Sequence, residues 1–167
     1  MEDNKKNSTG AKLIESIFLG ILAAFGALIV EFLTYSLGGN LPFEEWKLAL
    51  FILVERAFIE ELFKCLIIYK KIGSLSSRGI ILLNSAFVGL GFAATEFLLL
   101  FSKEGVGFAN NMQPLVGIAS IHIVTALIAG YIISNNRLAT IKIIWKIIAI
   151  NLLIHFVYNF MALQRII

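Results

Sequence analysis

The chain has 167 residues, of which 59% are hydrophobic and only 15% are charged, with a formal net charge of +3. A mean hydropathy of +0.88 excludes a water-soluble globular domain, because so short a domain has too little polar surface to cover that many apolar side chains. The composition therefore predicts an integral membrane protein. Its basic balance is attributed to loops that set topology and not to binding of nucleic acid.

Five apolar segments follow a short polar tail, residues 1–12, that we expect to be cytoplasmic. They cover about residues 13–37, 46–69, 80–101, 115–133 and 141–162. Each has roughly the 20 residues that cross a bilayer as a helix. The first is too long for the core of a signal peptide, so we expect it to stay as an anchor. The sequence thus predicts an all-α, polytopic bundle of about five transmembrane helices, with residues 13–167 forming one domain.

Lys and Arg are distributed unequally between the loops. Alternate loops and flanks hold nine on the side of the N-terminus and three on the other side. Positively charged loops of membrane proteins stay in the cytoplasm. We therefore expect a multi-pass protein of the cell membrane with a cytoplasmic N-terminus and an external C-terminus.

The second apolar segment carries more charges than a lipid-facing helix tolerates. Residues 54–71 read VERAFIEELFKCLIIYKK and include Glu55, Arg56, Glu60, Glu61 and Lys64. A charge at the centre of a membrane helix costs about 2.5 to 3.5 kcal/mol, whereas a strong hydrophobe returns only about 0.3 to 0.6. Because Arg56, Glu60 and Lys64 follow at intervals of four, we expect a ladder of ion pairs on one face. Such charges are either mutually neutralised structural groups or the mark of a functional site.

The third segment combines a small-residue edge with one isolated carboxylate. It contains SAFVGLGFAATEF, in which Ser85, Gly89 and Ala93 are spaced at intervals of four. Small residues at this spacing allow a neighbouring helix to approach closely. Glu96 lies about one turn beyond this edge and has no charged neighbour on its own helix.

The two histidines of the chain both lie deep in predicted spans. His122 is in the fourth segment with Thr125 one turn on, and His155 is in the fifth on one stripe with Asn151 and Asn159. A lone histidine in an apolar helix is more often a packing residue than a ligand. With three of the carboxylates, however, these imidazoles form a set spread over four helices, which suits acid–base catalysis or divalent-metal binding. We expect the set to converge on one pocket of water.

The depth of these groups in the bilayer sets a condition on the second helix. At about 1.5 Å per residue, the histidines and Glu96 fall in the outer half of the membrane, whereas Glu60 lies deeper if the helix enters at Trp46. The stretch LPFEEWKLALF, which begins with Leu41 and Pro42, is rich in interfacial residues. It predicts that the first turns lie at the surface and that the helix enters near Leu50.

Four short motifs, in this order, resemble those of the PrsW-type intramembrane proteases. They are EELFK (Glu60, Glu61, Lys64), GLGFAATE (ending at Glu96), HIVTALIAG (beginning at His122) and HFVYN (His155, Asn159). The wider superfamily, which includes CAAX prenyl proteases and bacteriocin-immunity-type proteases, shows EExxxR, FxxxH and HxxxN elements. Here Lys64 stands at EExxK, and Glu96 replaces the histidine of FxxxH, which is the PrsW variant. The likeness covers about residues 55–160, and the chain is shorter than typical members, which carry additional helices.

The resemblance implies hydrolysis of a peptide bond in a membrane-anchored protein, at a wet cavity within the lipid bilayer. The catalytic residues that it implies are Glu60, Glu61, Lys64, Glu96, His122, His155 and Asn159. Glu60 would be the general base that activates water, and Glu61 would hold the helix pair together. His155 and Asn159 would bind the oxyanion, and His122 with Glu96 would orient water or protonate the leaving amine.

Metal use is left open by the sequence. Zinc held by His122, His155 and Glu96 would match the first shell of catalytic zinc sites, with an open position for water. However, the chain has no HExxH motif, and these ligands would come from three helices. A metal-free glutamate mechanism fits nearly as well.

Other functions also use such residues. A small transporter or proton relay would string them along the membrane normal instead of gathering them about one water. A catalytically inactive family member would keep them for structure. A prenyl-protein endopeptidase of the CAAX kind is disfavoured by Glu96, which stands where that group has histidine.

Overall fold

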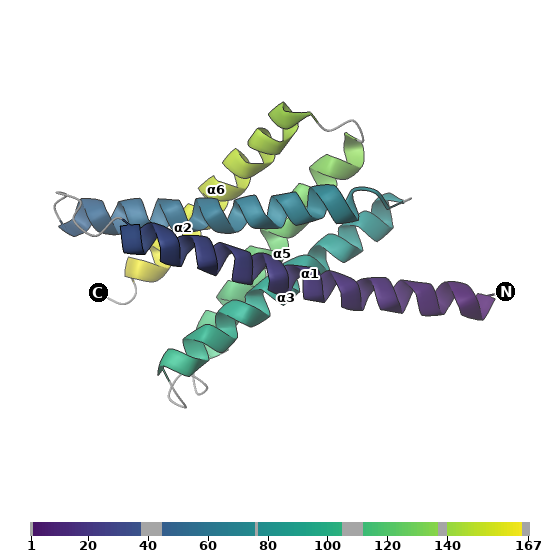
Figure 1. Ribbon diagram of the computed structural model, residues 1–167, viewed down its shortest axis with the longest axis horizontal. Helices are drawn as coiled ribbons and strands as arrows, with labels where there is room; N and C mark the ends of the chain where they lie inside the picture. Colours follow the sequence, from purple (N-terminus) through teal and green to yellow (C-terminus); the bar gives the residue numbers. More distant parts are fainter. Residues whose placement is uncertain (1, 38–44, 76, 105–111, 137–139, 165–167) are drawn as a thin grey trace.

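The structure, a computed structural model, describes residues 2–37, 45–75, 77–104, 112–136 and 140–164, and all regular structure within them is helical. The elements are α1 (Glu2–Leu37), α2 (Glu45–Ile67), the π-helical turn η1 (Ile68–Ile72), α3 (Arg78–Glu104), α5 (Met112–Asn135) and α6 (Ile141–Gln164). Successive long helices alternate in direction, so α1 begins and α6 ends at opposite ends of the bundle (Figure 1). The predicted all-α bundle is confirmed.

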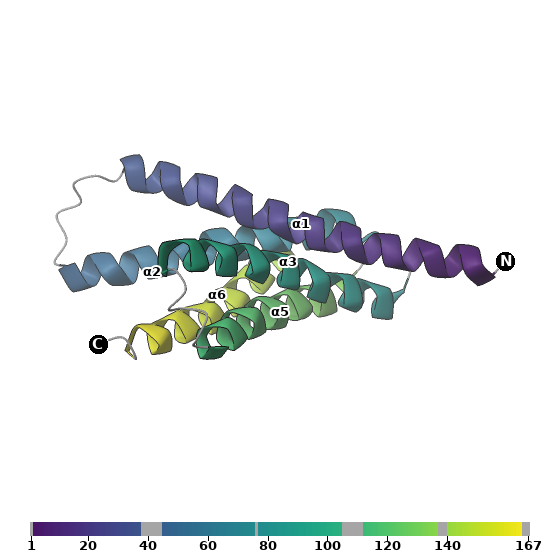
Figure 2. The ribbon, with the colours of Figure 1, turned by 90° about the horizontal axis from the view of Figure 1, so that it is seen from below.

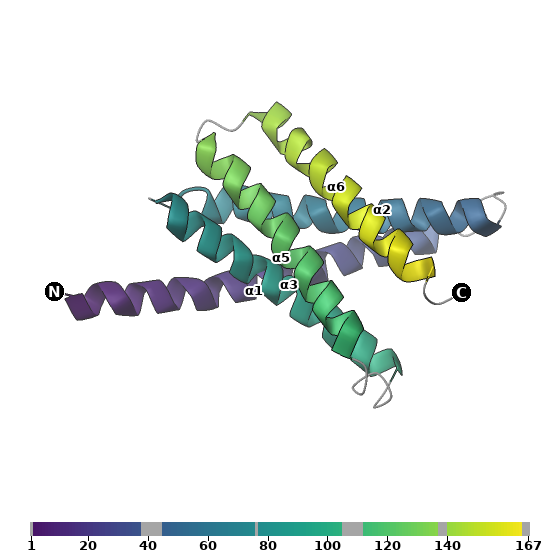
Figure 3. The ribbon, with the colours of Figure 1, turned by 180° about the vertical axis from the view of Figure 1, so that it is seen from behind.

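The long helices form three layers, with α2 in the middle one. Figure 2 shows α1 on one side, α2 and α3 next to it, and α5 and α6 on the far side. The contacts agree with this view, because α1 packs on α2 and α3, while α6 packs on α2 and α5. Seen from behind, α5 and α6 lie in front of α2 (Figure 3). Neighbouring helices therefore cover Glu60, Glu61 and Lys64 of α2, and this explains why the helix tolerates these charges.

Four helical segments are long and apolar enough to cross a membrane. They are Gly10–Thr34, Arg78–Ser102, Leu115–Asn135 and Ile141–Ala162. The chain is therefore a multi-pass membrane protein. Of the five predicted spans, only the second is not among these four, because α2 has 23 residues but too many charges. Its length of about 34 Å, at 1.5 Å per residue, is still sufficient to cross a bilayer.

The outward face of α1 is apolar along most of its length. Phe18, Leu22, Phe25, Ile29 and Phe32 recur at intervals of three or four and are each 51% to 70% exposed. A continuous exposed stripe of this kind would be an aggregation hazard in water, but it suits contact with lipid. The stripe therefore supports the assignment of α1 as a span.

Two predictions concern the ends of helices. The polar tail predicted for residues 1–12 is helical from Glu2 onward, where it forms the first part of α1. The second helix begins at Glu45. Pro42 and Glu44, on which the prediction of an interfacial start partly depends, lie outside the described residues.

Helices α1 and α3 cross with their backbones in contact at two glycines. A Cβ added to Gly20 would lie 2.1 Å from the carbonyl oxygen of Val88, and one added to Gly91 would lie 2.2 Å from that of Ile17. Both distances are far below van der Waals contact. The crossing therefore requires hydrogen in place of a side chain at each position.

The opposite side of α3 approaches α5 just as closely. A Cβ on Gly89 would lie 2.5 Å from the carbonyl oxygen of His122, and one on Gly130 would lie 2.3 Å from the hydroxyl oxygen of Ser85. The prediction that Ser85 and Gly89 form an edge for close helix packing is thus confirmed. This contact brings the backbone that carries His122 against the helix that carries Glu96.

We expect Gly20→Ala to lower the free energy of unfolding by about 1 to 3 kcal/mol, because the added methyl group overlaps a backbone carbonyl that cannot move alone. Gly10→Ala is the matched control in the same helix, since a Cβ there meets nothing within 4 Å. Unfolding in detergent micelles, followed by circular dichroism, measures both. Equal effects of the two substitutions would contradict the tight crossing.

Candidate active site

Polar side chains from α2, α5 and α6 gather in the interior of the bundle. They are Glu60, Glu61, Lys64, His122, Thr125, Asn151 and His155, and each is at least nine-tenths buried. Glu96 of α3 joins them through His122. The carboxylates and imidazoles expected to meet from four helices therefore do lie together.

Glu61 is the hub that joins α2 to α6. Its carboxylate is fully buried and accepts a hydrogen bond from Lys64 Nζ at 2.5 Å. It also accepts one from His155 Nδ1 at 2.8 Å and one from Asn151 Nδ2 at 3.1 Å. Three donors around one carboxylate compensate for its removal from water. This arrangement agrees with the expectation that Glu61 holds the helix pair together.

The Lys64 ammonium group uses its three donor positions within the cluster. Besides Glu61, its Nζ lies 2.9 Å from His122 Nδ1 and 3.0 Å from Thr125 Oγ1. The side chain therefore pairs with Glu61 on its own helix and also reaches across to α5. Lys64 is only 1% exposed, so these contacts replace its hydration.

The ladder of ion pairs predicted along α2 is not formed among the described residues. Arg56 pairs with Glu31 of α1, with 3.1 Å between Nε and Oε2. Lys64 pairs with Glu61, three residues earlier, and not with Glu60. The prediction was wrong because α1 supplies the partner of Arg56 and because Glu61, at the three-residue spacing, and not Glu60 is the partner of Lys64.

His122 is held through both of its ring nitrogens. An ammonium group has no lone pair, so Nδ1 accepts from Lys64. The remaining nitrogen, Nε2, then carries the proton and donates to Glu96 Oε2. The ring of Phe92 lies 4.7 Å from the imidazole between centroids. These contacts fix both the tautomer and the orientation of the ring.

His155 is oriented by Glu61. Its Nδ1 donates to Oε1 of that carboxylate, and its Nε2 lies 3.5 Å from Glu60 Oε2. In the neutral imidazole Nε2 therefore presents a lone pair toward Glu60. A histidine whose far nitrogen is held by a carboxylate is the usual form of a metal-binding or proton-accepting histidine.

Glu60, like Glu96, is a carboxylate of the cluster that lines a cavity. Its Oε2 is buried and has no hydrogen-bond partner among the described residues. Glu60 lines a cavity of about 140 Å³ between α1, α2 and α3, which has room for several water molecules. The other lining residues are Ala24, Ala27, Leu28, Glu31, Arg56, Phe92, Glu96, Leu99 and Leu100. A buried carboxylate oxygen without a protein partner at such a cavity is a natural acceptor for water.

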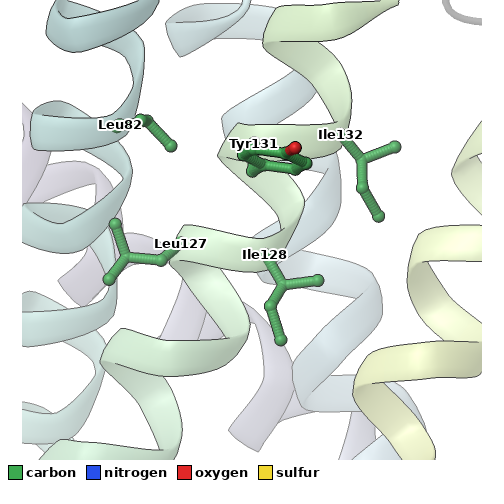
Figure 4. A pocket seen from close by; sticks show the side chains of 5 residues that line it. All are labelled: Leu82, Leu127, Ile128, Tyr131 and Ile132. Atoms are coloured by element: carbon green, nitrogen blue, oxygen red, sulfur yellow. The ribbon is translucent and has the colours of Figure 1, made fainter.

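A second, larger hollow lies elsewhere. It has about 420 Å³ and is lined by Leu82, Leu127, Ile128, Tyr131 and Ile132. Figure 4 shows the side chains of Leu127 and Ile128 beside Tyr131 on α5, with Leu82 across from them on α3. Its lining offers no carboxylate, imidazole or cation. Size alone would place the site here, but the chemistry places it at the smaller cavity.

Three of the clustered residues have the donors that a metal ion needs. Glu60, His122 and His155 each offer one ligand atom, and these atoms lie within 4.8 Å of one another. The unpaired oxygen of Glu60 and the lone pair on His155 Nε2 fit this role directly, whereas His122 would exchange one of its present hydrogen bonds for the ion. Glu96, expected as a ligand, instead hydrogen-bonds to His122. This group of three residues can thus hold a divalent metal.

Asn159 stands apart from the cluster. It is half-buried one turn beyond His155 on α6, and no hydrogen bond joins it to another described residue. Its expected role beside His155 stays a prediction.

Glu31 is a site residue that the sequence reasoning missed. It lines the cavity and pairs with Arg56, although α1 was expected to be only an anchor. The available signal was a carboxylate inside an otherwise apolar span, since ionisable residues at such positions commonly mark sites.

Comparison with known proteins agrees with this geometry. The family model for PrsW family intramembrane metalloprotease matches residues 10–167, and so extends beyond the motif-bearing helices to α1. Comparisons with curated proteins and with solved structures gave no match. The chain, a peptide hydrolase of the membrane, therefore belongs to the PrsW family of intramembrane metalloproteases.

Proposed function

We propose that this protease cleaves a membrane-anchored protein within the bilayer and that Glu60 is the general base that activates the attacking water. The observation that carries the proposal is that Glu60 lines the 140 Å³ cavity while its buried Oε2 has no hydrogen-bond partner among the described residues. A general base needs a lone pair directed at a bound water. Glu61 lacks this property because Lys64, Asn151 and His155 engage both of its oxygens.

The neighbouring histidines supply the route for the proton. Glu60 takes a proton from the water as the hydroxide adds to the substrate carbonyl, and His155 Nε2 lies 3.5 Å from that carboxylate. The imidazolium formed on transfer is stabilised by Glu61, which already accepts from Nδ1. It can then donate to the oxyanion or to the leaving amine. His122 is linked to the cavity through Glu96, the lining carboxylate to which its Nε2 donates.

A divalent ion, zinc by the chemistry of the donors, is also part of the proposal. Glu60, His122 and His155 would hold the ion. Glu96, which lines the cavity, would not be a ligand. Bound there, zinc would polarise the substrate carbonyl and favour ionisation of water. With the ion bound, Glu60 would be a metal ligand in place of a general base. Cleavage would therefore require Glu60 with or without the ion.

The arrangement favours a hydrolase over a proton relay. A relay needs its groups spaced along the membrane normal, whereas the ligand atoms of Glu60, His122 and His155 lie within 4.8 Å of one another. One water or ion placed among these atoms could therefore contact several of them at once. This convergence matches what hydrolysis requires.

The site lies nearer one end of the bundle. Glu31 is three residues before the end of the first span, Gly10–Thr34, so the cavity that it lines is close to the membrane surface at which α1 ends. With the N-terminus in the cytoplasm, as the loop charges favour, this is the outer surface. We accordingly place the cleavage point near the external face.

The function is tested by reconstituting the purified protein in liposomes with a pool of synthetic peptides, each with a span of about 20 apolar residues. We expect new peptide termini, detected by mass spectrometry, with the wild type and none with Glu60→Gln. The absence of new termini with the wild type across the pool would count against the proposal.

Metal use is tested by metal analysis of the same preparation. We expect about one divalent ion per chain, and loss of both the ion and cleavage after chelation or in His122→Ala, because each removes a donor–ion contact. Thr125→Val is the control, since it removes one hydrogen bond of Lys64 but no metal donor. Activity that survives chelation and His122→Ala would remove zinc from the proposal and leave the metal-free reaction.

A further inference from the structure

A charged pair lies at the wall of the cavity, one turn away from Glu60. Arg56 of α2 and Glu31 of α1 both line the cavity, and 3.1 Å separates Nε from Oε2. The Arg56 side chain is 48% exposed, whereas that of Glu31 is 14% exposed. The carboxylate is thus packed into the wall, and the guanidinium is accessible to an incoming molecule.

The guanidinium of Arg56 retains unused hydrogen-bonding capacity. Among the described residues only its Nε has a partner. Both terminal nitrogens, with four N–H donors, are therefore available. Because Glu31 fixes Nε, the planar fork is held in one orientation, which lowers the entropic cost of binding an acceptor.

The negative charges on the cavity wall indicate which kind of acceptor group Arg56 can bind. The remaining ionisable side chains on its wall are carboxylates, namely Glu31, Glu60 and Glu96. An anionic ligand would approach all three, whereas a neutral carbonyl oxygen would not be repelled. A peptide must unwind before its backbone can be hydrolysed, and an unwound backbone in a membrane has carbonyl groups that need donors.

We propose that Arg56 binds a backbone carbonyl of the substrate and that Glu31 is the positioning residue that orients it. The inference rests on the proposed peptidase function. Glu60 comes four residues after Arg56 on α2, a rise of about 6 Å, and an extended peptide advances about 3.3 Å per residue. The substrate carbonyl held by Arg56 is therefore about two residues away from the peptide bond that is cleaved beside Glu60. The ligand class is an extended, uncharged stretch of peptide.

The experiment measures binding separately from cleavage. Fluorescently labelled single-span peptides from the pool are titrated into liposomes that carry the full-length Glu60→Gln variant, with and without Arg56→Gln. We expect Arg56→Gln to weaken binding about 10- to 100-fold, as loss of a charge-assisted hydrogen bond does. In the wild-type background we expect the same change to raise KM with little effect on kcat.

Conservative variants show whether peptide binding depends on the planar geometry of the Arg56 guanidinium or only on its charge. Arg56→Lys keeps the charge without the planar fork and should recover only part of the affinity. Glu31→Gln leaves the guanidinium unanchored and should weaken binding less than Arg56→Gln does. The controls are Glu55→Gln, a nearby carboxylate outside the cavity lining, and Arg78→Gln, an arginine that instead stacks on Tyr131. Both should bind as the parent does.

The possible outcomes separate this inference from the peptidase proposal. Equal affinity with and without the Arg56→Gln change, in protein that retains its helical circular dichroism, overturns the inference, as does full recovery by Arg56→Lys or a failure of every labelled peptide to bind. Peptide binding that depends on Arg56, without cleavage by the wild type, supports the inference and contradicts the peptidase proposal.

Discussion

Replacing Glu60 by Gln is expected to lower the rate of peptide cleavage by about 100- to 10,000-fold, the range attributed to a general base. The amide keeps the size of the carboxylate but cannot take a proton from water. Should the side chain act as a metal ligand instead, the amide is also the poorer ligand. The fold should persist, because Glu60 Oε2 has no hydrogen-bond partner among the described residues.

The measurement is the rate of appearance of new peptide termini in liposomes, with thermal unfolding recorded on the same samples. Glu55→Gln is the matched control, because it makes the same chemical change five residues earlier on α2, outside the cavity lining. Cleavage by Glu60→Gln at the rate of the control would exclude Glu60 as base and as essential ligand. Loss of activity with an unchanged melting curve would also exclude a catalytically inactive family member.

Replacing Lys64 by Met should lower the free energy of unfolding by about 3 to 5 kcal/mol, as breaking one side of a buried ion pair does. Lys64 and Glu61 are 1% and 0% exposed, and 2.5 Å separates Nζ from Oε1. Met fills a similar volume but leaves the Glu61 charge buried without its cation. Asn151 and His155 still donate to that carboxylate, so the lower end of the range is expected.

The double variant, Lys64→Met with Glu61→Gln, tests the cause. If the uncompensated charge is responsible, neutralising it should recover a large part of the loss, and the two changes should be strongly non-additive. Unfolding in detergent measures all three variants. Lys146→Met, at an exposed position on α6, is the control and should change stability little. Additive losses would show that Lys64 acts through packing and not through its charge.

Cleavage by these stability variants should fall as well, although for another reason. Lys64 positions the Nδ1 side of His122, and Glu61 holds Nδ1 of His155. Both imidazoles lose an orienting partner when the pair is broken. The proposed proton donors therefore depend on a structural ion pair whose two residues do not line the cavity.

The sequence by itself determined the class of the molecule and the identity of most of its polar groups. Apolar runs of membrane-spanning length give helices because no other single segment satisfies its own backbone in lipid. The helices therefore lie close to the predicted segments. The small-residue edge at Ser85 and Gly89 was readable for the same reason, since its spacing is a property of one helix.

The tertiary structure alone decided which polar group meets which. Spacing within α2 predicted that Arg56 and Lys64 would both pair with Glu60. Instead Arg56 pairs with Glu31 of α1, and Lys64 pairs with Glu61 and also contacts His122 of α5. Adjacent Glu60 and Glu61 look alike in sequence, but one faces the cavity and the other is enclosed by three donors. The physical reason is that the axial rotation and depth of each helix are set by packing against its neighbours. A periodic pattern fixes which residues share a face, whereas only assembly fixes what that face meets.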